Sequence, residues 1–238
     1  MNSMKKIFIA LDTDKISKAK KIINECSYSK LNIGYKVGLQ LFYLKGGRKF
    51  VSQISKKHSI FLDLKISDIS NTAKSALKSL KDIKFDYITV HINSGYKSIV
   101  EVKREAKKIN KNLKVLGVTV LTSFDQNSFK EIGYSKSIEQ IVKKNSMLAK
   151  KAKLDGLICS GSEIKVVRKN FNGLIIVPGI RLKGDNKDDN FQLSFFDVED
   201  PKMQEIRKII ENLDIDNLSP VEALIKLNQI KKEIKNED

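Results

Sequence analysis

The chain has 238 residues, 41% of them hydrophobic, and carries a formal net charge of +17. That length is enough for one large α/β core. The five apolar residues after Lys6 are too few for the core of a signal peptide, and no run approaches the ~18 residues of a membrane span. The sequence therefore predicts a cytoplasmic protein without a membrane partner.

The basic residues are mostly lysines spread evenly along the chain, and only five of the 45 are arginines. Nucleic-acid-binding proteins usually cluster their basic residues and use arginine for bidentate contacts. We therefore expect a solvated, lysine-rich surface and no nucleic-acid partner. The two cysteines, Cys26 and Cys159, form no CxxC motif and are expected to be reduced thiols.

Short apolar runs alternate along the chain with longer segments of helical period. The runs span residues 6–11, 33–38, 59–65, 86–91, 113–121, 155–160 and 174–179. Between them, segments such as 136–152 place apolar residues three and four apart, which is typical of amphipathic helices. Strands that are apolar nearly throughout indicate a parallel sheet covered on both faces. Because no Pro- or Gly-rich linker interrupts this order, we expect a single domain over residues 1–238.

Two α/β architectures fit this order, an open doubly wound sheet and a (β/α)8 TIM barrel. The first βα turn, ALDTDKIS (10–17), lacks the GxGxxG of a dinucleotide-binding sheet. Polar residues instead recur at the carboxyl ends of the runs. These residues are Asp12, Lys36, Asp63, Lys65, His91, Thr122 and Arg181. In a barrel those ends converge on one mouth, where active sites are built, so the barrel is favoured.

The stretch FLDLKISDISNT (61–72) places an acid and a base at the end of a buried run. Side chains two apart on a strand face the same way, so Asp63 and Lys65 should lie together, with Lys36 on the neighbouring strand. One interpretation is a buried ion pair with no further role, although such pairs add little stability. The other is a charge array that handles an anionic substrate and a developing carbanion.

The segment DLKISDISNT (63–72) resembles the Asp-x-Lys-x-x-Asp-Ile-x-Asn-Thr signature of the orotidine 5′-phosphate decarboxylase family. Other segments agree with that family in order and spacing. They are ALD (10–12), YKVGLQLF (35–42), TVH (89–91), VTVLTS (118–123), DGLICS (155–160), PGIR (178–181) and SPVEALIKLN (219–228). Asp-x-Lys-x-x-Asp alone also occurs in other phosphosugar enzymes of the superfamily, so the segments carry the resemblance together.

The resemblance implies a homodimeric barrel that converts orotidine 5′-monophosphate to uridine 5′-monophosphate in pyrimidine biosynthesis without metal or cofactor. It implies that Lys65 protonates C6 of the pyrimidine while Asp63 lies against the substrate carboxylate. Asp68 would come from the partner subunit, so that the two active sites are shared. With two histidines and no Cys/His cluster, the sequence gives no sign of a metal site. His91 is expected to have a structural role.

The resemblance also implies a set of substrate-binding residues beyond the charge array. Asp12 and Lys36 would hold ribose hydroxyls, and Arg181 would approach the phosphate. The residues expected to line the nucleotide pocket are Ile69, Thr72 and Thr122. A glutamine that usually follows the acidic loop has its nearest counterpart in Gln192.

The sequence departs from the family pattern after Asn190. The family's eighth strand ends in Gly-Arg, which binds the phosphate. Residues 191–218 contain no glycine and a single arginine, Arg207. Pro201–Leu213 is predicted to be a helix, because Asp200 can cap it and its isoleucines share one face. Only 213–218 then remains for an eighth strand, which we expect to be short or missing. Arg181, Gln192 and backbone amides would hold the phosphate.

Two other interpretations stay open on the sequence alone. The chain could be a catalytically impaired or repurposed member that binds nucleotides or partners. It could also be a phosphosugar lyase of the same superfamily, which would need Mg²⁺, although the PGIR and VTVLTS segments argue against this.

Overall fold

The computed structural model describes residues 7–27, 31–178, 193, 194 and 226. The chain divides into two compact units, Met1–Asp197 and Val198–Asp238, and the second contains only one described residue, Lys226. All described elements lie in the first unit except the single helical residue Lys226. The single domain over residues 1–238 stays a prediction.

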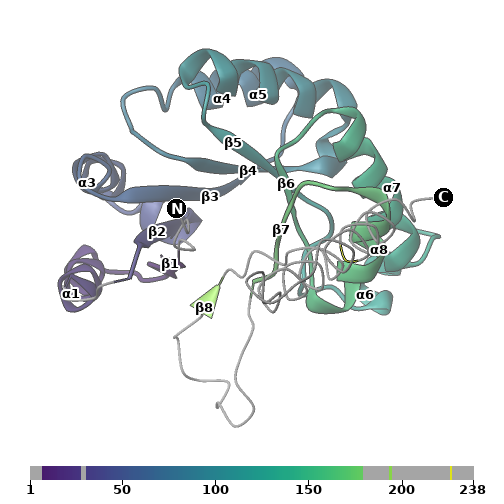
Figure 1. The fold of residues 1–238 in the computed structure, drawn as a ribbon, viewed down its shortest axis with the longest axis horizontal. Coiled ribbons are helices and arrows are strands. Elements are labelled where there is room, and N and C mark those ends of the chain that lie inside the picture. The colour runs from purple at the N-terminus through teal and green to yellow at the C-terminus, as the bar shows by residue number, and fades with distance from the viewer. Residues whose placement is uncertain (1–6, 28–30, 179–192, 195–225, 227–238) are drawn as a thin grey trace, which may run out of the picture. The chain divides into compact units, whose positions relative to one another are not determined.

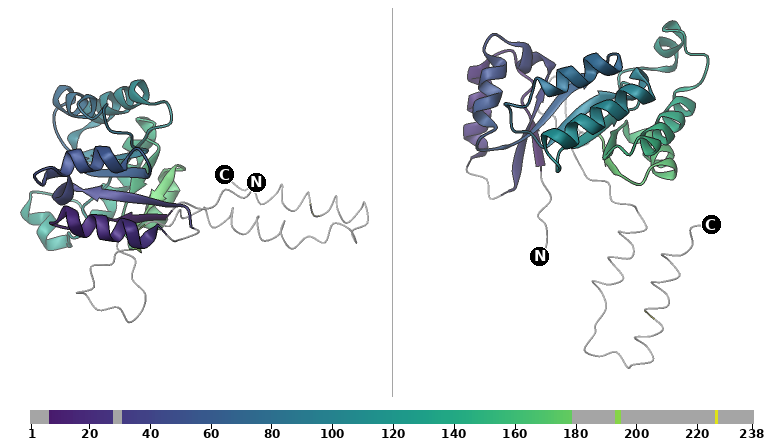
Figure 2. Two further views of the ribbon diagram at one scale, coloured as in Figure 1. Left: turned by 90° about the vertical axis from the view of Figure 1, so that its left-hand side faces the viewer. Right: turned by 90° about the horizontal axis from the view of Figure 1, so that it is seen from above.

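Seven parallel strands follow one another in chain order across a single sheet. They are β1 (Ile7–Ala10), β2 (Ile33–Gly38), β3 (Ser59–Ile66), β4 (Tyr87–His91), β5 (Lys114–Val118), β6 (Gly156–Ile158) and β7 (Leu174–Ile176). Each lies within one of the seven predicted apolar runs or extends it by one residue. The sheet curls, as a barrel requires, and its helices lie on the outside (Figures 1 and 2). The expected parallel α/β architecture is confirmed.

The helices occupy the connections between strands. They are α1 (Ile16–Cys26), α2 (Leu39–Tyr43), α3 (Gly47–Ile54), α4 (Ser70–Lys78), α5 (Tyr96–Ile109), α6 (Gln126–Glu131), α7 (Ile138–Lys151) and α8 (Ile164–Asn170), with 3-10 turns η1 (Ile92–Ser94) and η2 (Gly161–Glu163). The period in 136–152 correctly predicted α7, which begins at a capping box formed by Ser137 and Gln140.

The strand next to β1, at one edge of the sheet, is short. β8 (Leu193–Ser194) has two residues and pairs antiparallel with β1, so the described part of the sheet starts at β7 and ends at β8. The described part of the sheet holds no eighth parallel strand, which is consistent with the prediction of a short or missing one; β8 is a different segment from the one expected to supply it. The predicted helix at Pro201–Leu213 and the candidate strand at 213–218 lie outside the described residues.

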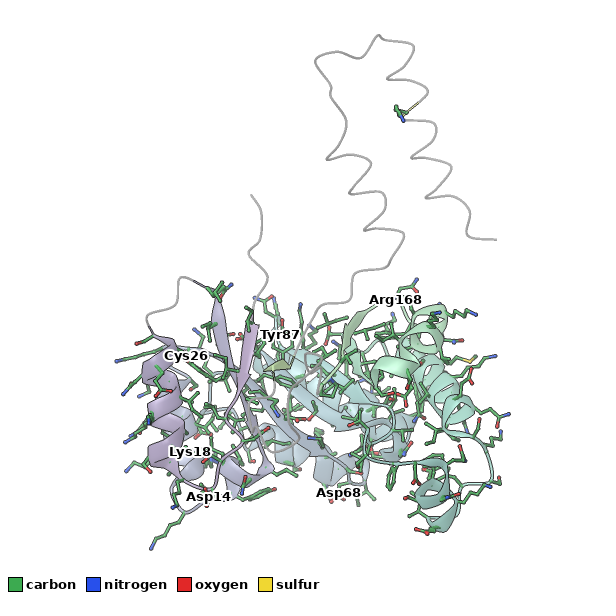
Figure 3. The ribbon with its side chains drawn as sticks, turned by 90° about the horizontal axis from the view of Figure 1, so that it is seen from below. Asp14, Lys18, Cys26, Asp68, Tyr87 and Arg168 are labelled. Atoms are coloured by element: carbon green, nitrogen blue, oxygen red, sulfur yellow. The ribbon has the colours of Figure 1, made fainter. Side chains whose placement is uncertain are left out.

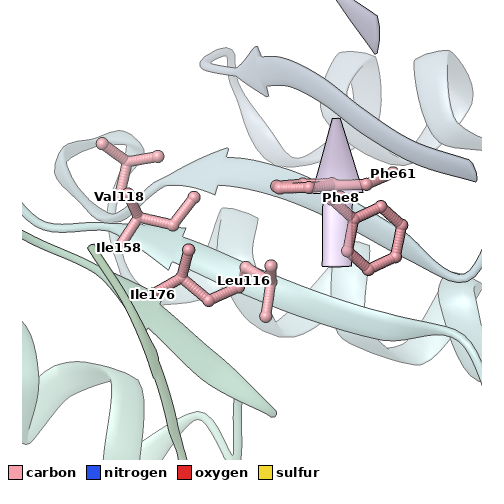
Figure 4. Close-up of a cluster of buried hydrophobic side chains, with 6 residues drawn as sticks. All are labelled: Phe8, Phe61, Leu116, Val118, Ile158 and Ile176. Atoms are coloured by element: carbon pink, nitrogen blue, oxygen red, sulfur yellow. The ribbon is translucent and has the colours of Figure 1, made fainter. Parts of the chain in front are cut away.

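Both faces of the sheet are buried, as the continuous apolar runs predict. On the outer face, residues such as Ile60, Leu62 and Ile88 are fully buried beneath the helices. The concave face holds one apolar cluster, which Figure 4 shows. Its members are Phe8, Phe61, Leu116, Val118, Ile158 and Ile176.

The aromatic end of this cluster depends on a glycine. The rings of Phe8 and Phe61 meet edge to face, with centroids 5.9 Å apart. A Cβ at Gly34 would lie 2.6 Å from the Phe8 ring, so only glycine leaves room for it on β2. This packing fills the amino-terminal level of β1 to β4 on the concave face and leaves the carboxyl ends of these strands for polar side chains.

Candidate active site

The candidate site lies where β1 to β4 end. Figure 3 shows that Asp14 and Asp68, which follow β1 and β3, lie at one end of the sheet. Tyr87, which begins β4, and Cys26 lie toward the opposite end. The carboxyl ends of the parallel strands therefore meet on one side, as the barrel interpretation requires.

Four of the predicted side chains form one connected array of alternating charge. Lys36 Nζ lies 2.9 Å from Asp12 Oδ2 and 4.0 Å from Asp63 Oδ2. Lys65 Nζ lies 2.7 Å from the same Asp63 oxygen. The order Asp12–Lys36–Asp63–Lys65 places each ammonium next to a carboxylate, and it brings together residues from β2, β3 and the end of β1.

Exposure divides this array into a buried centre and a more open rim. The side chains of Lys36 and Asp63 are 10% and 11% exposed, whereas those of Lys65 and Asp12 are 33% and 45% exposed. Charges in a poorly solvated site interact more strongly with a ligand than charges in water do. The ammonium of Lys65 is thus both paired with a buried carboxylate and accessible to a small molecule.

An irregularity in the ladder between β3 and β4 shapes this array. The register runs Leu62↔Ile88 and then Ile66↔Val90, so the three residues from Asp63 to Lys65 stand opposite Thr89 alone. Lys65 has a φ of +47°, in the left-handed region that side chains rarely adopt. Bulges of this kind redirect side chains and often lie beside active sites.

Thr89 is a site residue that the sequence interpretation did not single out. It is fully buried, its Oγ1 donates to Asp63 Oδ1 at 3.0 Å, and it accepts the backbone N–H of Lys65 at 2.7 Å. The two-residue alternation that placed Asp63 with Lys65 does not predict a bulge. The sequence signals were a polar residue inside the apolar run 86–91 and the family segment TVH (89–91), to which Thr89 belongs.

His91 lies beside the array at the end of β4. Burial lowers the pKa of its imidazole, the positive charge of Lys65 lowers it further, and Asp63 partly opposes both. The neutral form of His91 is therefore favoured near neutral pH. This fits the predicted structural role and adds no third positive charge to the site.

The other predicted site residues are either exposed or outside the described residues. Asp68 is exposed, its Oδ1 accepts the N–H of Ile69 at 2.7 Å, and within the described part of the chain no ion pair joins it to Lys65. Ile69 is 72% exposed, and Thr72 and Thr122 are also exposed. Arg181 and Gln192 lie outside the described residues.

Among the residues that the structure describes, no group of three or more His, Cys, Asp or Glu side chains is arranged to hold a metal ion. None of the described helices is both long and apolar enough to cross a membrane.

Comparison with known proteins gives a consistent result. Residues 5–194 match the model of the orotidine 5′-phosphate decarboxylase / HUMPS family. The chain is 36% identical over 190 residues to the orotidine 5′-phosphate decarboxylase of Malacoplasma penetrans, covering 79% of this chain and 81% of that protein. It is 39% identical over 198 residues to the protein of the same name from Prochlorococcus marinus strain MIT 9312, covering 79% and 80%.

Solved structures agree with this match. The orotidine 5′-phosphate decarboxylase of Lactobacillus acidophilus superposes with a TM-score of 0.69 at 30% identity, over 74% of this chain and 82% of that one. The orotidine 5′-monophosphate decarboxylase of Methanocaldococcus jannaschii, solved with the inhibitor BMP, gives a TM-score of 0.62 at 26% identity over 78% and 83%.

The curled parallel sheet, with its charged residues gathered at the carboxyl ends of the strands, places the protein in the TIM-barrel class of α/β proteins. The family match and the relatives then settle its place within that class. The chain belongs to the orotidine 5′-phosphate decarboxylase / HUMPS family.

Proposed function

We propose that this protein decarboxylates orotidine 5′-monophosphate to uridine 5′-monophosphate in pyrimidine biosynthesis, without a metal ion or cofactor. Family membership supports the reaction class. The observation that carries the proposal is the array in which Asp63 lies between two ammonium groups, 2.7 Å from Lys65 and 4.0 Å from Lys36.

Lys65 is the proposed general acid. In the reaction the bond from C6 to the carboxylate breaks, carbon dioxide leaves, and the electron pair remains on C6. The pyrimidine offers no electron sink for that pair, so a fixed positive charge must stabilise it. The ammonium of Lys65 supplies the charge and then gives its proton to C6, and the neutral amine regains a proton from water.

Asp63 is proposed to lie against the substrate carboxylate and to hold the ammonium of Lys65 in place. Its like charge would favour departure of the carboxylate, although the main contribution assigned to it is orientation of Lys65. Lys36 balances Asp63 from the other side, which keeps the buried centre of the array close to neutral. Asp12 and Lys36 together would bind the ribose hydroxyls at the rim.

The remaining binding residues are proposed from the family pattern. Ile69, Thr72 and Thr122 would line the nucleotide pocket. Arg181 and Gln192 would contact the phosphate together with backbone amides, because the Gly-Arg of the family's eighth strand has no counterpart in residues 191–218. Loss of a charged contact to phosphate weakens binding by roughly 1.5–3 kcal/mol, so the KM is expected to be at least about tenfold above that of a typical member.

We further propose a cytoplasmic homodimer with two-fold symmetry, in which Asp68 of each subunit completes the array of the other. Support comes from the exposure of Asp68 and of Ile69 beside it. A two-fold interface is isologous, so one loop can enter both sites. Mixing inactive Lys65→Ala and Asp68→Ala subunits should restore activity, because a heterodimer has one site with both defects and one with neither. No recovery after demonstrated subunit exchange would contradict a shared site.

The proposed reaction is tested by following the absorbance of orotidine monophosphate with purified protein and excess EDTA. The expected result is loss of substrate with formation of uridine monophosphate at a rate that EDTA does not change. Activity only on a phosphosugar, and only with added Mg²⁺, would favour a lyase of the same superfamily. Nucleotide binding without turnover would favour a repurposed member.

A further inference from the structure

Thr89 forms hydrogen bonds with Asp63 and Lys65, the first and last residues of the bulge in β3. No role has been assigned to it above. We propose that Thr89 is a positioning residue, whose hydroxyl fixes the backbone of Lys65 and the carboxylate orientation of Asp63. The effect of this positioning on turnover rests on the proposed decarboxylation. The positioning itself concerns only Thr89, Lys65 and Asp63.

The first step is the backbone of Lys65. Between the pairs Leu62↔Ile88 and Ile66↔Val90, β3 has three residues and β4 has only Thr89. Lys65 has no register partner on β4, and its N–H donates to Thr89 Oγ1 at 2.7 Å. A left-handed conformation in a residue with a side chain persists only where its surroundings hold it. Thr89 is the contact that holds the main chain of Lys65 to the neighbouring strand.

The second step is the direction of the hydroxyl proton. An ionised carboxylate only accepts hydrogen bonds, so Thr89 donates to Asp63 Oδ1, at 3.0 Å. A hydroxyl has one proton, so the lone pairs of Oγ1 are left for the N–H of Lys65. The two hydrogen bonds form a chain from Lys65 through Thr89 to Asp63, and bonds in such chains strengthen one another.

The third step is that the two carboxylate oxygens of Asp63 have different partners. Thr89 holds Oδ1, while Oδ2 faces Lys65 Nζ at 2.7 Å and Lys36 Nζ at 4.0 Å. Rotation of the carboxylate would break the bond to Thr89. The hydroxyl therefore fixes both the main chain that carries the ammonium of Lys65 and the carboxylate that orients that ammonium.

A matched set of variants separates positioning from simple support of the fold. Thr89→Val keeps the shape but removes the hydroxyl, and Thr89→Ser keeps the hydroxyl. Thr119 provides the control, because it is also fully buried and its Oγ1 donates to a backbone oxygen, that of Ile158, at 3.1 Å. Thr119→Val thus removes one buried hydrogen bond with no connection to the charged residues.

We expect Thr89→Val to lower the melting temperature more than Thr119→Val, because it removes two hydrogen bonds, one of them to a carboxylate, whereas Thr119→Val removes one. Only Thr89→Val should lower kcat, by roughly 10- to 100-fold with KM changed less than about threefold, because misplaced catalytic groups act mainly on the chemical step. Thr89→Ser should recover most of kcat. An unchanged kcat in Thr89→Val, or an equal loss in Thr119→Val, would overturn the inference.

A second readout does not depend on turnover. Hydrogen exchange of the Lys65 amide, measured by NMR, should be slow in the wild type and in Thr89→Ser, and at least about tenfold faster in Thr89→Val. If the wild-type protein fails to decarboxylate orotidine monophosphate, the proposed function fails, and this exchange rate alone decides whether Thr89 holds Lys65. Equal exchange in wild type and Thr89→Val would refute the geometric part as well.

Discussion

At the carboxyl-terminal level of the concave face, the two halves of the sheet carry opposite kinds of side chain along one continuous ladder. His91 on β4 is paired in register with Val118 on β5, and the ladder continues through Ile158 and Ile176 on β6 and β7. On the β1 to β4 side of this line stand Lys36, Asp63 and Lys65, and on the β5 to β7 side the ladder itself carries the aliphatic Val118, Ile158 and Ile176.

This contrast separates two tasks within one sheet. Desolvated ion pairs contribute little net stability, so the charged half cannot be explained as a support for the fold. Buried aliphatic side chains do stabilise the fold, and they also keep water from one side of the charges, which strengthens the field at Lys65. We therefore expect substitutions in the charged half to change turnover, and substitutions in the apolar half to change the free energy of unfolding.

Lys65→Ala gives the largest expected effect. Its kcat for orotidine monophosphate should fall by at least ~10²-fold, because the proton donor and the charge that stabilises the carbanion vanish together. The melting temperature should hardly change, since Asp63 keeps its hydrogen bond from Thr89 and lies near Lys36. The control is Lys143→Ala, which removes an exposed lysine of α7. A variant at Lys65 that retained a tenth of the wild-type kcat would contradict this assignment.

Leu116→Ala probes the apolar half. Leu116 is fully buried in the concave cluster, so truncation should lower the free energy of unfolding by about 2–5 kcal/mol, measured by urea denaturation. The folded fraction should keep a kcat within about threefold of wild type, because no charged group moves. A loss of kcat as large as that in Lys65→Ala, in folded protein, would show that the two halves do not divide the tasks.

Asp12→Ala tests the rim of the charged half. Asp12 is partly exposed and 2.9 Å from Lys36, and its proposed contact is with ribose rather than with the reacting carbon. Loss of one charged hydrogen bond to substrate should raise KM about tenfold or more and change kcat less. Steady-state kinetics decide between these parameters. A fall in kcat with an unchanged KM would move Asp12 into the chemical step.

The smallest expected effect is a pH dependence at the boundary between the halves. Burial, followed by the charge of Lys65, lowers the pKa of His91 below its ordinary value of 6.5. The unfolded chain therefore takes up a proton first as the pH falls, so this contribution to stability is present above about pH 6.5 and is lost below it. Chemical denaturation at pH 7 and pH 5.5 should show a smaller loss of stability for His91→Gln than for wild type.

His58 provides a comparison for this pH effect. Burial, and then Lys57, lowers the pKa of His58 in the same direction, but its ring packs edge to face on Tyr35, away from the charge array. His58→Gln should therefore also reduce the acid-induced loss of stability while leaving kcat unchanged. If neither variant differs from wild type between the two pH values, the protonation of these histidines is not linked to folding.

Much of this architecture could be predicted because it depends on local patterns. The apolar runs predicted all seven parallel strands, since strands buried on both faces need continuous apolar sequence. Two-residue alternation and the neighbouring strand brought Lys36, Asp63 and Lys65 together correctly. These predictions needed only the period of a strand and the convergence of parallel strand ends.

The parts that could not be predicted depend on pairing between strands. The bulge opposite Thr89 and the left-handed φ of Lys65 arise from the register of β3 against β4, which no local pattern encodes. Glycine or asparagine usually marks a left-handed conformation in a sequence, and position 65 is a lysine. The site role of Thr89 was missed for the same reason, because it appears only once the two strands are aligned.

Lys65 is proposed to exchange a proton with C6 of the pyrimidine. By microscopic reversibility, an enzyme that protonates a C6 carbanion must also remove that proton from uridine monophosphate. Incubation of uridine monophosphate in D₂O, followed by NMR, measures the exchange directly and requires no loss of carbon dioxide. Exchange at C6 should exceed the buffer rate with wild-type protein and should equal the buffer rate with Lys65→Ala. Equal exchange with the two proteins would contradict this proposal.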